Sequence, residues 1–181
     1  MRFALAALVL VAIAGCGGDS DEVTTPSAPE GIRLESPAFE DGGGLPARFT
    51  CDGDGVSPPL RWREVSPRAR DLALLVEDPD ASGGTFVHWT VWKLPFAEGG
   101  QGRVLEGNVA PEMDEGQNDF GERGWGPACP PEGDPPHRYV FSLYALDRLI
   151  DLGDGASADD VRAAIDADAF AEGRLEAVYS R

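Results

Sequence analysis

The chain has 181 residues, and its 32 aspartates and glutamates outnumber its 15 lysines and arginines, which gives a formal net charge of -17. So acidic a protein repels polyanions, and this excludes nucleic acid as a partner. Beyond its first residues the chain has the length of a single domain, with no internal repeat and no break in composition.

The N-terminus predicts export and a lipid anchor. Arg2 supplies a positive charge, and residues 3–14 form an apolar run that is too short to cross a bilayer as a mature helix. The run ends Ile-Ala-Gly directly before Cys16, which resembles the lipobox of bacterial lipoproteins, where a diacylglycerol is added to the cysteine. An ordinary signal peptide and a short buried apolar segment are the alternatives. The pattern favours residues 1–16 as a lipoprotein signal peptide and Cys16 as the anchor on the outer face of a bacterial cell membrane.

The segment that follows the anchor predicts a flexible tether. Residues 17–29 are rich in Gly, Ser, Thr, Asp and Pro and contain almost nothing to bury. Such a segment cannot offset the entropy lost on ordering. The folded domain is therefore expected to cover residues 30–181.

The remaining cysteines agree with export. If Cys16 carries lipid, Cys51 and Cys129 form an even pair, and outside the cytoplasm such a pair favours a disulfide. Closing a loop of that length stabilises the folded state by about 4 kcal/mol on the chain-entropy model. Two buried thiols are the alternative. A metal site is the third option, which no Cys-x-x-Cys spacing supports, so neither a metal nor a cofactor is expected.

The first half of the domain predicts several β-strands. Apolar and polar residues alternate at 33–36, 47–50 and 60–63, as they do in half-buried strands. Residues 72–76 form a continuous apolar run, which is typical of a central strand. The fold is therefore expected to begin as a sheet.

Two later strands place the aromatic residues. A strand at 86–94 puts His88 and Trp92 on one face and Trp89 on the other, because side chains alternate along a strand. A strand at 138–146 puts Tyr139 and Phe141 on a shared face.

The rest of the chain completes a mostly β fold. Residues 98–136 show no sustained period and are rich in Gly, Pro, Asn and Asp, with room for short strands such as 103–105. One helix begins near Ser157, which can cap it, and 174–179 alternates like a closing strand. Strands first and a helix late predict an antiparallel β-sandwich with a peripheral C-terminal helix.

Both histidines of the chain, His88 and His137, lie in segments that also hold paired carboxylates, an arginine and prolines. Imidazole N–H groups and a tyrosine hydroxyl can donate to phosphate oxygens, and a neighbouring carboxylate favours the protonated imidazole. A second carboxylate can take a ligand ammonium. This chemistry suits a phosphate with an amine attached, such as phosphoethanolamine.

Each of these residues also has a purely structural interpretation. The sequence from Asp78 to Asp80 can be a turn that ends a strand, with a carboxylate capping local backbone. His88 can be a satisfied core residue, and Arg138 can form a salt bridge. Trp125, in a glycine-rich loop, can line the rim of a pocket.

The motifs taken together resemble the phosphatidylethanolamine-binding protein family, in its bacterial and archaeal branch often called Raf-kinase-inhibitor-like. The resemblance covers nearly the whole domain in order and is carried by nine segments: Ser36-Pro37-Ala38-Phe39, Phe49-Thr50-Cys51-Asp52-Gly53, Ser57-Pro58-Pro59-Leu60-Arg61-Trp62, Asp78-Pro79-Asp80-Ala81, His88-Trp89, Asn118-Asp119-Phe120-Gly121, Cys129-Pro130-Pro131, His137-Arg138-Tyr139 and Tyr144-Ala145-Leu146-Asp147.

The resemblance implies a β-sandwich of that family's type with a small pocket at one end that binds phosphate-like anions. The branch usually has a proline where this chain has Ser82, and Gly-Pro where it has Pro127-Ala128, which alters the freedom of the pocket wall. Carried over residue by residue, the implied ligand-binding residues are the acidic pair, the two histidines, the tyrosine and the two prolines: Asp78, Asp80, His88, His137, Tyr139, Pro130 and Pro131.

The leading function is a lipid-anchored, extracytoplasmic binding protein for a small phosphate-containing or zwitterionic ligand. The alternative is a protein-interaction module that resembles a protease inhibitor, with residues 99–126 entering the cleft of an extracellular protease. An enzyme is not expected, because the chain has no His-Glu-x-x-His, no Gly-x-Ser-x-Gly and no phosphate-cradling glycine loop with lysine.

Overall fold

The structure is a computed structural model, and it describes residues 28–29, 31–107 and 109–181. The predicted signal peptide, Cys16 and residues 17–27 of the predicted tether lie outside the described residues. Within the described residues, no helix has both the length and the apolar character needed to cross a membrane.

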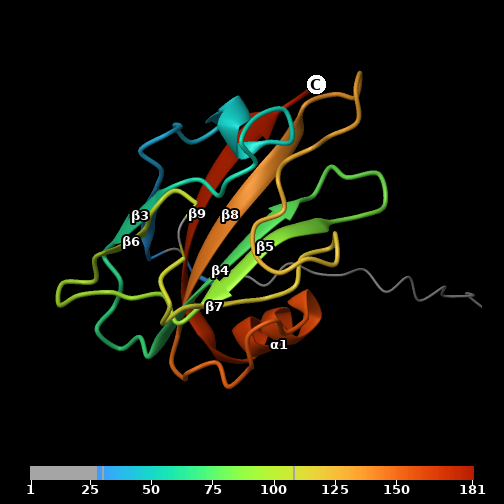
Figure 1. The fold of residues 1–181 in the computed structure, drawn as a ribbon. Coiled ribbons are helices and arrows are strands. Elements are labelled where there is room, and N and C mark those ends of the chain that lie inside the picture. Colours follow the sequence, from blue (N-terminus) through green and yellow to red (C-terminus); the bar gives the residue numbers. More distant parts are fainter. Residues whose placement is uncertain (1–27, 30, 108) are drawn as a thin grey trace, which may run out of the picture.

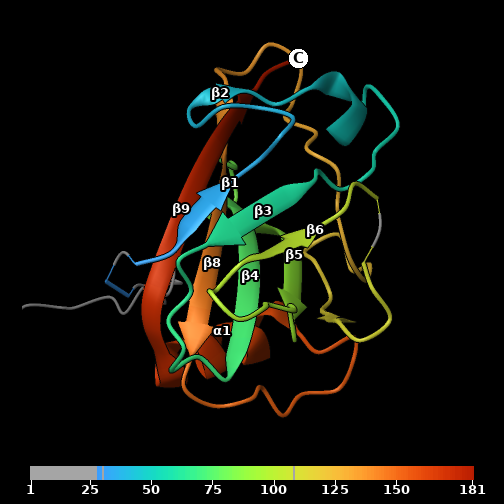
Figure 2. The same cartoon turned by 90° about the vertical axis from the view of Figure 1, so that its left-hand side faces the viewer.

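Two sheets pack face to face, and Figure 2 shows the smaller one lying over the larger. The small sheet is antiparallel and has the order β1 (Arg33–Glu35), β3 (Leu60–Arg63), β6 (Gly102–Val104). The large sheet has the order β2 (Gly43–Gly44), β9 (Ala169–Tyr179), β8 (His137–Leu146), β4 (Asp71–Asp78), β5 (Phe86–Trp92), β7 (Asp114–Glu115). Its pairings are antiparallel except the short one between β2 and β9. The predicted sandwich is confirmed.

The main core lies between the sheets. The inner face of β4 contributes Leu72, Leu74 and Val76, and alternate residues of β8, beginning with Tyr139 and Phe141, join them. All five side chains are at most 1 % exposed. The alternation predicted for 138–146 is therefore confirmed, and it directs Tyr139 toward the small sheet.

Helix α1 (Ala158–Asp168) covers the opposite face of the large sheet (Figure 1). Its N-terminus is capped as predicted, because the Ser157 side chain accepts a hydrogen bond from the backbone N–H of Asp160 at 3.2 Å. Val161 and Ile165 are fully buried against this face of the sheet. The closing strand β9 follows the helix directly and starts at Ala169, earlier than the 174–179 pattern indicates.

Residues 47–50 do not form the predicted strand. They form a single turn of 3-10 helix, η1 (Ala47–Phe49), in which the N–H of Phe49 donates to the carbonyl of Pro46 at 3.0 Å. Pro46 has its φ at -58°, a value that suits the entry to a helical turn. In this turn Arg48 is exposed and Phe49 is buried. A strand would give the same alternation, which is why the sequence pattern predicts one here.

Strand β5 also departs from the prediction, because it contains a bulge. Val76 of β4 pairs with Trp89, but Glu77 pairs with Val87, so His88 is an extra residue without a partner opposite. After the bulge the faces exchange: Trp89 packs in the core between the sheets, and Trp92 packs beneath the helix. His88 is thereby turned toward the inner face.

Candidate functional site

Four buried polar side chains meet at one end of the large sheet, on its inner face. Asp78 is the last residue of β4, and His137 and Tyr139 begin β8, so regular alternation gives all three the same side as the main core. The bulge brings His88 to them from β5, and its ring centroid lies 5.1 Å from that of Tyr139. Residues that are far apart in the sequence therefore form one cluster.

Asp78 and His137 form a buried pair. The Nδ1 of His137 lies 2.7 Å from Oδ2 of Asp78, and the other carboxylate oxygen accepts the backbone N–H of Asp80 at 2.8 Å. Since a carboxylate accepts, Nδ1 is the nitrogen that donates, and Nε2 is left for other partners. The one charged group near Nε2 among the described residues is Asp134, whose half-exposed carboxylate lies 3.9 Å away.

His88 is held in the same manner by backbone. Its Nδ1 donates to the carbonyl of Gly126 at 2.8 Å, and the N–H of Gly126 donates to the carbonyl of His88 at 2.8 Å. Burial lowers the pKa of His88 below its ordinary value, despite the opposing effect of the bond to Gly126 and the charge of Asp78. At neutral pH the ring is therefore uncharged, and its Nε2 is an acceptor.

The hydroxyl of Tyr139 lacks a hydrogen-bond partner among the described residues, although its oxygen is fully buried. Burial raises the pKa of Tyr139 far above the ordinary value, and the nearby charge of Asp78 adds to the rise. The side chain is thus a neutral phenol with an unused O–H donor. An unsatisfied buried hydroxyl costs about 1–3 kcal/mol, so it calls for an explanation.

These residues line a pocket of about 120 Å³, together with Ala81, Ser82, Phe86, Phe120, Cys129, Pro130 and Pro131. One water needs ~10–15 Å³ of such volume, and sites for drug-sized molecules have roughly 300–1,000 Å³. The pocket therefore fits a small chemical group rather than an extended ligand.

A disulfide fixes the proline wall of the pocket. Cys51 and Cys129 are bonded, with their Cα atoms 5.4 Å apart, which is the pairing that the sequence favours. The N–H of Cys51 also donates to the carbonyl of Ala128 at 3.0 Å. The segment that carries Pro130 and Pro131 is thus tied to the turn after η1.

Two phenylalanines form an apolar edge. Phe86 and Phe120 have ring centroids 4.7 Å apart, and Phe120 is 50 % exposed. Asn118 organises this loop, because its side chain accepts the N–H groups of Phe120 and Glu122. A Cβ at Gly126 would lie 2.5 Å from the Phe120 ring, so only glycine leaves room for this arrangement.

The pocket contains six of the seven ligand-binding residues predicted from the sequence. Asp80 does not line it, because its carboxylate forms a two-point ion pair with Arg138 at 2.8 and 2.9 Å, and this pairing lowers the pKa of Asp80. Trp125 lies behind His88 rather than in the lining, with ring centroids 6.2 Å apart. The sequence reasoning missed Phe86 and Phe120 as lining residues, although Phe120 lies in a motif that carried the resemblance.

Segment 99–126 is attached to the body of the protein at several points. The N–H of Gly116 donates to the carbonyl of Thr90, and that of Gln117 donates to the carbonyl of Ala156. The segment also contains β6 and β7. Within the described residues, no group of three or more histidines, cysteines or acids is placed to hold a metal ion.

Comparison with known proteins agrees with this arrangement. The sequence model of the phosphatidylethanolamine-binding protein family matches residues 35–180. The chain belongs to the phosphatidylethanolamine-binding protein family. A UPF0098 protein of Methanothermobacter thermautotrophicus is 40% identical over 157 residues, which cover 83% of this chain and 99% of that protein.

Two further proteins extend the comparison. LppC of Mycobacterium tuberculosis, described as a candidate lipoprotein, is 37% identical over 187 residues, covering 94% of this chain and 91% of LppC. The crystal structure of Escherichia coli YbcL, described as a member of the mammalian PEBP family, has a TM-score of 0.76 and 30% identity, covering 83% of this chain and 98% of YbcL. The sandwich fold of this family member is thus shared with a solved structure.

Proposed function

We propose that this protein is a lipid-anchored, extracytoplasmic binding protein that holds a small phosphate-containing or zwitterionic ligand in the pocket of Asp78, His88, His137 and Tyr139. The observation that carries the proposal is the hydroxyl of Tyr139, a buried donor without a partner among the described residues. A bound acceptor oxygen would satisfy it.

The proton positions define what the pocket can hold. Both imidazoles use Nδ1 as a donor toward the protein, so each has Nε2 left for the ligand. A neutral Nε2 accepts from a protonated phosphate oxygen or an amine. A protonated Nε2 donates to an anion, which requires His88 to take up a proton that burial now disfavours. Binding of a fully ionised phosphate therefore becomes tighter as the pH falls.

The surroundings suit a zwitterion. Asp80 is committed to Arg138, but Asp134 is 45 % exposed and lies 3.9 Å from Nε2 of His137, so its carboxylate can hold a ligand ammonium. The rings of Phe86 and Phe120 offer a second contact for a cation at the pocket edge. The small volume leaves any acyl chain outside.

The anchor is supported by the sequence before Cys16, since a small-residue run precedes the cysteine. The relative LppC, described as a candidate lipoprotein, aligns over nearly the whole of this chain. An exported domain also agrees with the disulfide between Cys51 and Cys129.

The test is an NMR titration with inorganic phosphate and with phosphoethanolamine that follows the ring signals of both histidines. We expect saturable shifts at His88 and His137, and their loss in His137→Ala. Arg123→Gln, in an exposed ion pair outside the pocket lining, is the control and should titrate like the wild type. Histidine signals that stay unchanged at millimolar ligand would refute the pocket proposal.

A further inference from the structure

The outer face of the small sheet carries an unusual group of charges for so acidic a chain. Its outward-facing residues are four exposed arginines and one partly buried glutamate, a net charge of +3, and we call this surface the arginine face: Arg33, Glu35, Arg61, Arg63 and Arg103. Inward-facing Leu34, Leu60, Trp62 and Val104 are buried beneath it. Figure 2 looks onto this face, and no described helix or strand lies in front of it.

The arrangement of these arginines is unfavourable for the sheet itself. Arg33 stands directly opposite Arg63 across one strand pair, and Arg61 stands opposite Arg103 across the other. Like charges directly opposite each other destabilise a sheet. Stability therefore does not explain why both pairs are arginines.

Only one of the two pairs is compensated. The carboxylate of Glu35 contacts Arg33 at 3.0 Å and Arg63 at 2.6 Å. Glu35 also stands opposite Arg61 in the register, but it forms no ion pair with that side chain. Within the described part of the chain, Arg61 and Arg103 have no ion-pair partner, and Arg70 is the one other basic residue of which this is true.

The arginine face lies beside the point where the chain enters the domain. The N–H groups of Gly31 and Ile32 donate to the carbonyl of Glu172, and β1 begins with the next residue, Arg33. Sixteen residue-to-residue steps lead from Cys16 to Ile32, a length that cannot exceed about 58 Å at ~3.6 Å per step. A lipid on Cys16 therefore keeps the chain entry, and the arginine face beside it, within reach of the membrane.

We propose that the arginine face docks the domain on the anionic lipid headgroups of the membrane that carries its anchor. The proposal rests on the lipid anchor proposed above. Exposed guanidinium groups without an ion-pair partner are attracted to an anionic surface. The acidic remainder of the domain is repelled by that surface, and since charges beyond ~8 Å are screened at physiological salt, the domain turns its arginine face toward the lipid.

Docking in this orientation leaves the pocket usable. In the β8–β9 pair, Tyr144 stands opposite Glu172 at the chain entry, and His137 stands opposite Tyr179 at the pocket. The two places are therefore seven positions apart along β8, which is roughly 23 Å at ~3.3 Å per residue. The pocket lining and the arginine face share no residue, so we expect membrane docking and ligand binding to be independent.

The test is flotation of the full chain with vesicles of phosphatidylcholine, alone or mixed with phosphatidylglycerol. The chain carries Cys16→Ala, so no lipid is attached, and its apolar N-terminal segment is the same in every variant. We expect phosphatidylglycerol to add to the binding, and this added binding should be lost at 1 M salt, where the Debye length is ~3 Å. Arg61→Gln/Arg103→Gln should weaken this binding about 25-fold, since each arginine near an anionic surface contributes roughly five-fold.

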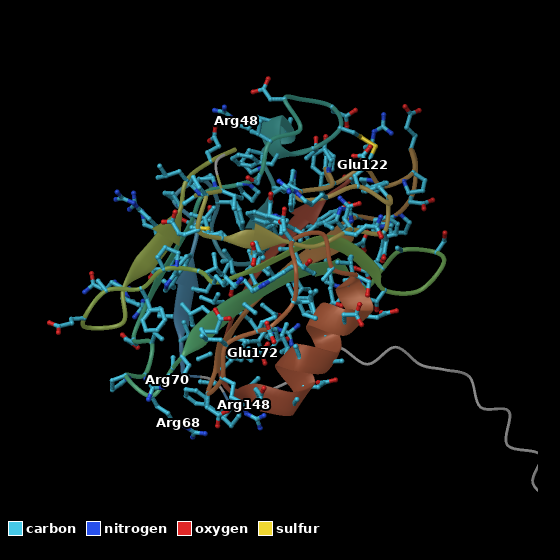
Figure 3. The ribbon with its side chains drawn as sticks, turned by 60° about the horizontal axis from the view of Figure 1, so that its bottom comes forward. Arg48, Arg68, Arg70, Glu122, Arg148 and Glu172 are labelled. Carbon is cyan, nitrogen blue, oxygen red and sulfur yellow. A yellow bond between two sulfur atoms is a disulfide. The ribbon has the colours of Figure 1, made fainter. Side chains whose placement is uncertain are left out.

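The matched control is Arg48→Gln/Arg123→Gln, which removes the same two charges from exposed positions outside the arginine face. Figure 3 shows Arg48 at the far end of the molecule from Glu172, the residue at the chain entry. We expect the control to bind the mixed vesicles within about two-fold of the wild type. Both double variants should keep the phosphate-dependent histidine shifts, so a failure here is distinct from a failure of the pocket.

Three outcomes would overturn the proposal. The first is wild-type binding that does not depend on phosphatidylglycerol, and the second is an equal loss in the two double variants. The third involves the acidic segment at Asp19, Asp21 and Glu22. In this outcome, neutralising these acids strengthens vesicle binding, but only while Arg61 and Arg103 are present. It would mean that this acidic segment, rather than the membrane, binds the arginine face.

Discussion

Glu77 and Asp78 are neighbours at the end of one strand, and they contrast two ways of burying a carboxylate. Glu77 points to the helix side, where its oxygen contacts Arg162 at 2.6 and 3.1 Å. Asp78 points to the inner side, where its partner is His137. Both acids are at most 4 % exposed.

The difference lies in the partner. Arginine keeps its charge at any physiological pH, so the Glu77 pair is permanent and fastens the helix to the strand. Histidine has a second ring nitrogen, and Nε2 of His137 is not used by the pair, so the Asp78 pair can also hold a ligand. A buried ion pair alone thus indicates structure, whereas a buried acid whose partner turns an unused nitrogen toward a pocket indicates a site.

The largest expected effect concerns the permanent pair. Arg162→Met leaves Glu77 buried without a partner and should lower the free energy of unfolding by about 3–5 kcal/mol, measured by urea denaturation. The exposed contact of Arg162 with Asp159 serves as the control, and Asp159→Asn should cost less than about 1 kcal/mol.

A double variant sharpens this prediction. Glu77→Leu/Arg162→Met replaces both charges with apolar groups, which is often nearly neutral for stability. If the double variant were as unstable as Arg162→Met alone, the cost would come from lost packing of the helix, and the contrast between the two carboxylates would fail.

The second expected effect is smaller and concerns the pH dependence of stability that His88 produces. Burial lowers the pKa of His88, so the unfolded chain binds more protons than the native one at pH values between the native pKa and ~6.5. Stability from this group is complete above ~6.5 and is lost as the pH falls through the native pKa. Unfolding free energies of the wild type should therefore decrease from pH 7.5 to about pH 5.

His88→Asn is the matched variant for this measurement. Asn offers an N–H donor in place of Nδ1, so the bond to the carbonyl of Gly126 can be retained without a titrating ring. The variant should lose less stability over the same pH range. Equal losses in the two proteins would show that other groups dominate and that the burial of His88 is not the cause.

The sequence predicts regular elements well and local exceptions poorly. Alternation predicts strand β8, and Ser157 predicts the cap of α1. Both predictions succeed because they depend on residues that are close together in the sequence. The cluster depends on a bulge at His88, which no periodicity reveals, since it is defined by the register with another strand. Alternation through the bulge gave Trp92 the wrong face.

Two features of the pocket also depend on tertiary contacts. Asp80 lies only two residues after Asp78 in the sequence. It does not line the pocket, because its carboxylate pairs with Arg138. Phe120 reaches the pocket because Asn118 folds its loop and Gly126 leaves space for the ring. The residue types in the motifs identified most of the lining, but their partners could only be assigned in the structure.

The hydroxyl of Tyr139 should donate to an oxygen of the bound ligand. The decisive experiment is thermal melting of the wild type and Tyr139→Phe, each with and without inorganic phosphate. Without phosphate the variant should melt at the same temperature as the wild type or higher, because it loses only an unsatisfied hydroxyl. Phosphate should raise the melting temperature of the wild type and raise that of the variant much less, since a hydrogen bond to an anion contributes about 1.5–3 kcal/mol. An equal rise in both proteins, or a variant that is less stable without phosphate, would show that the Tyr139 hydroxyl has no such role.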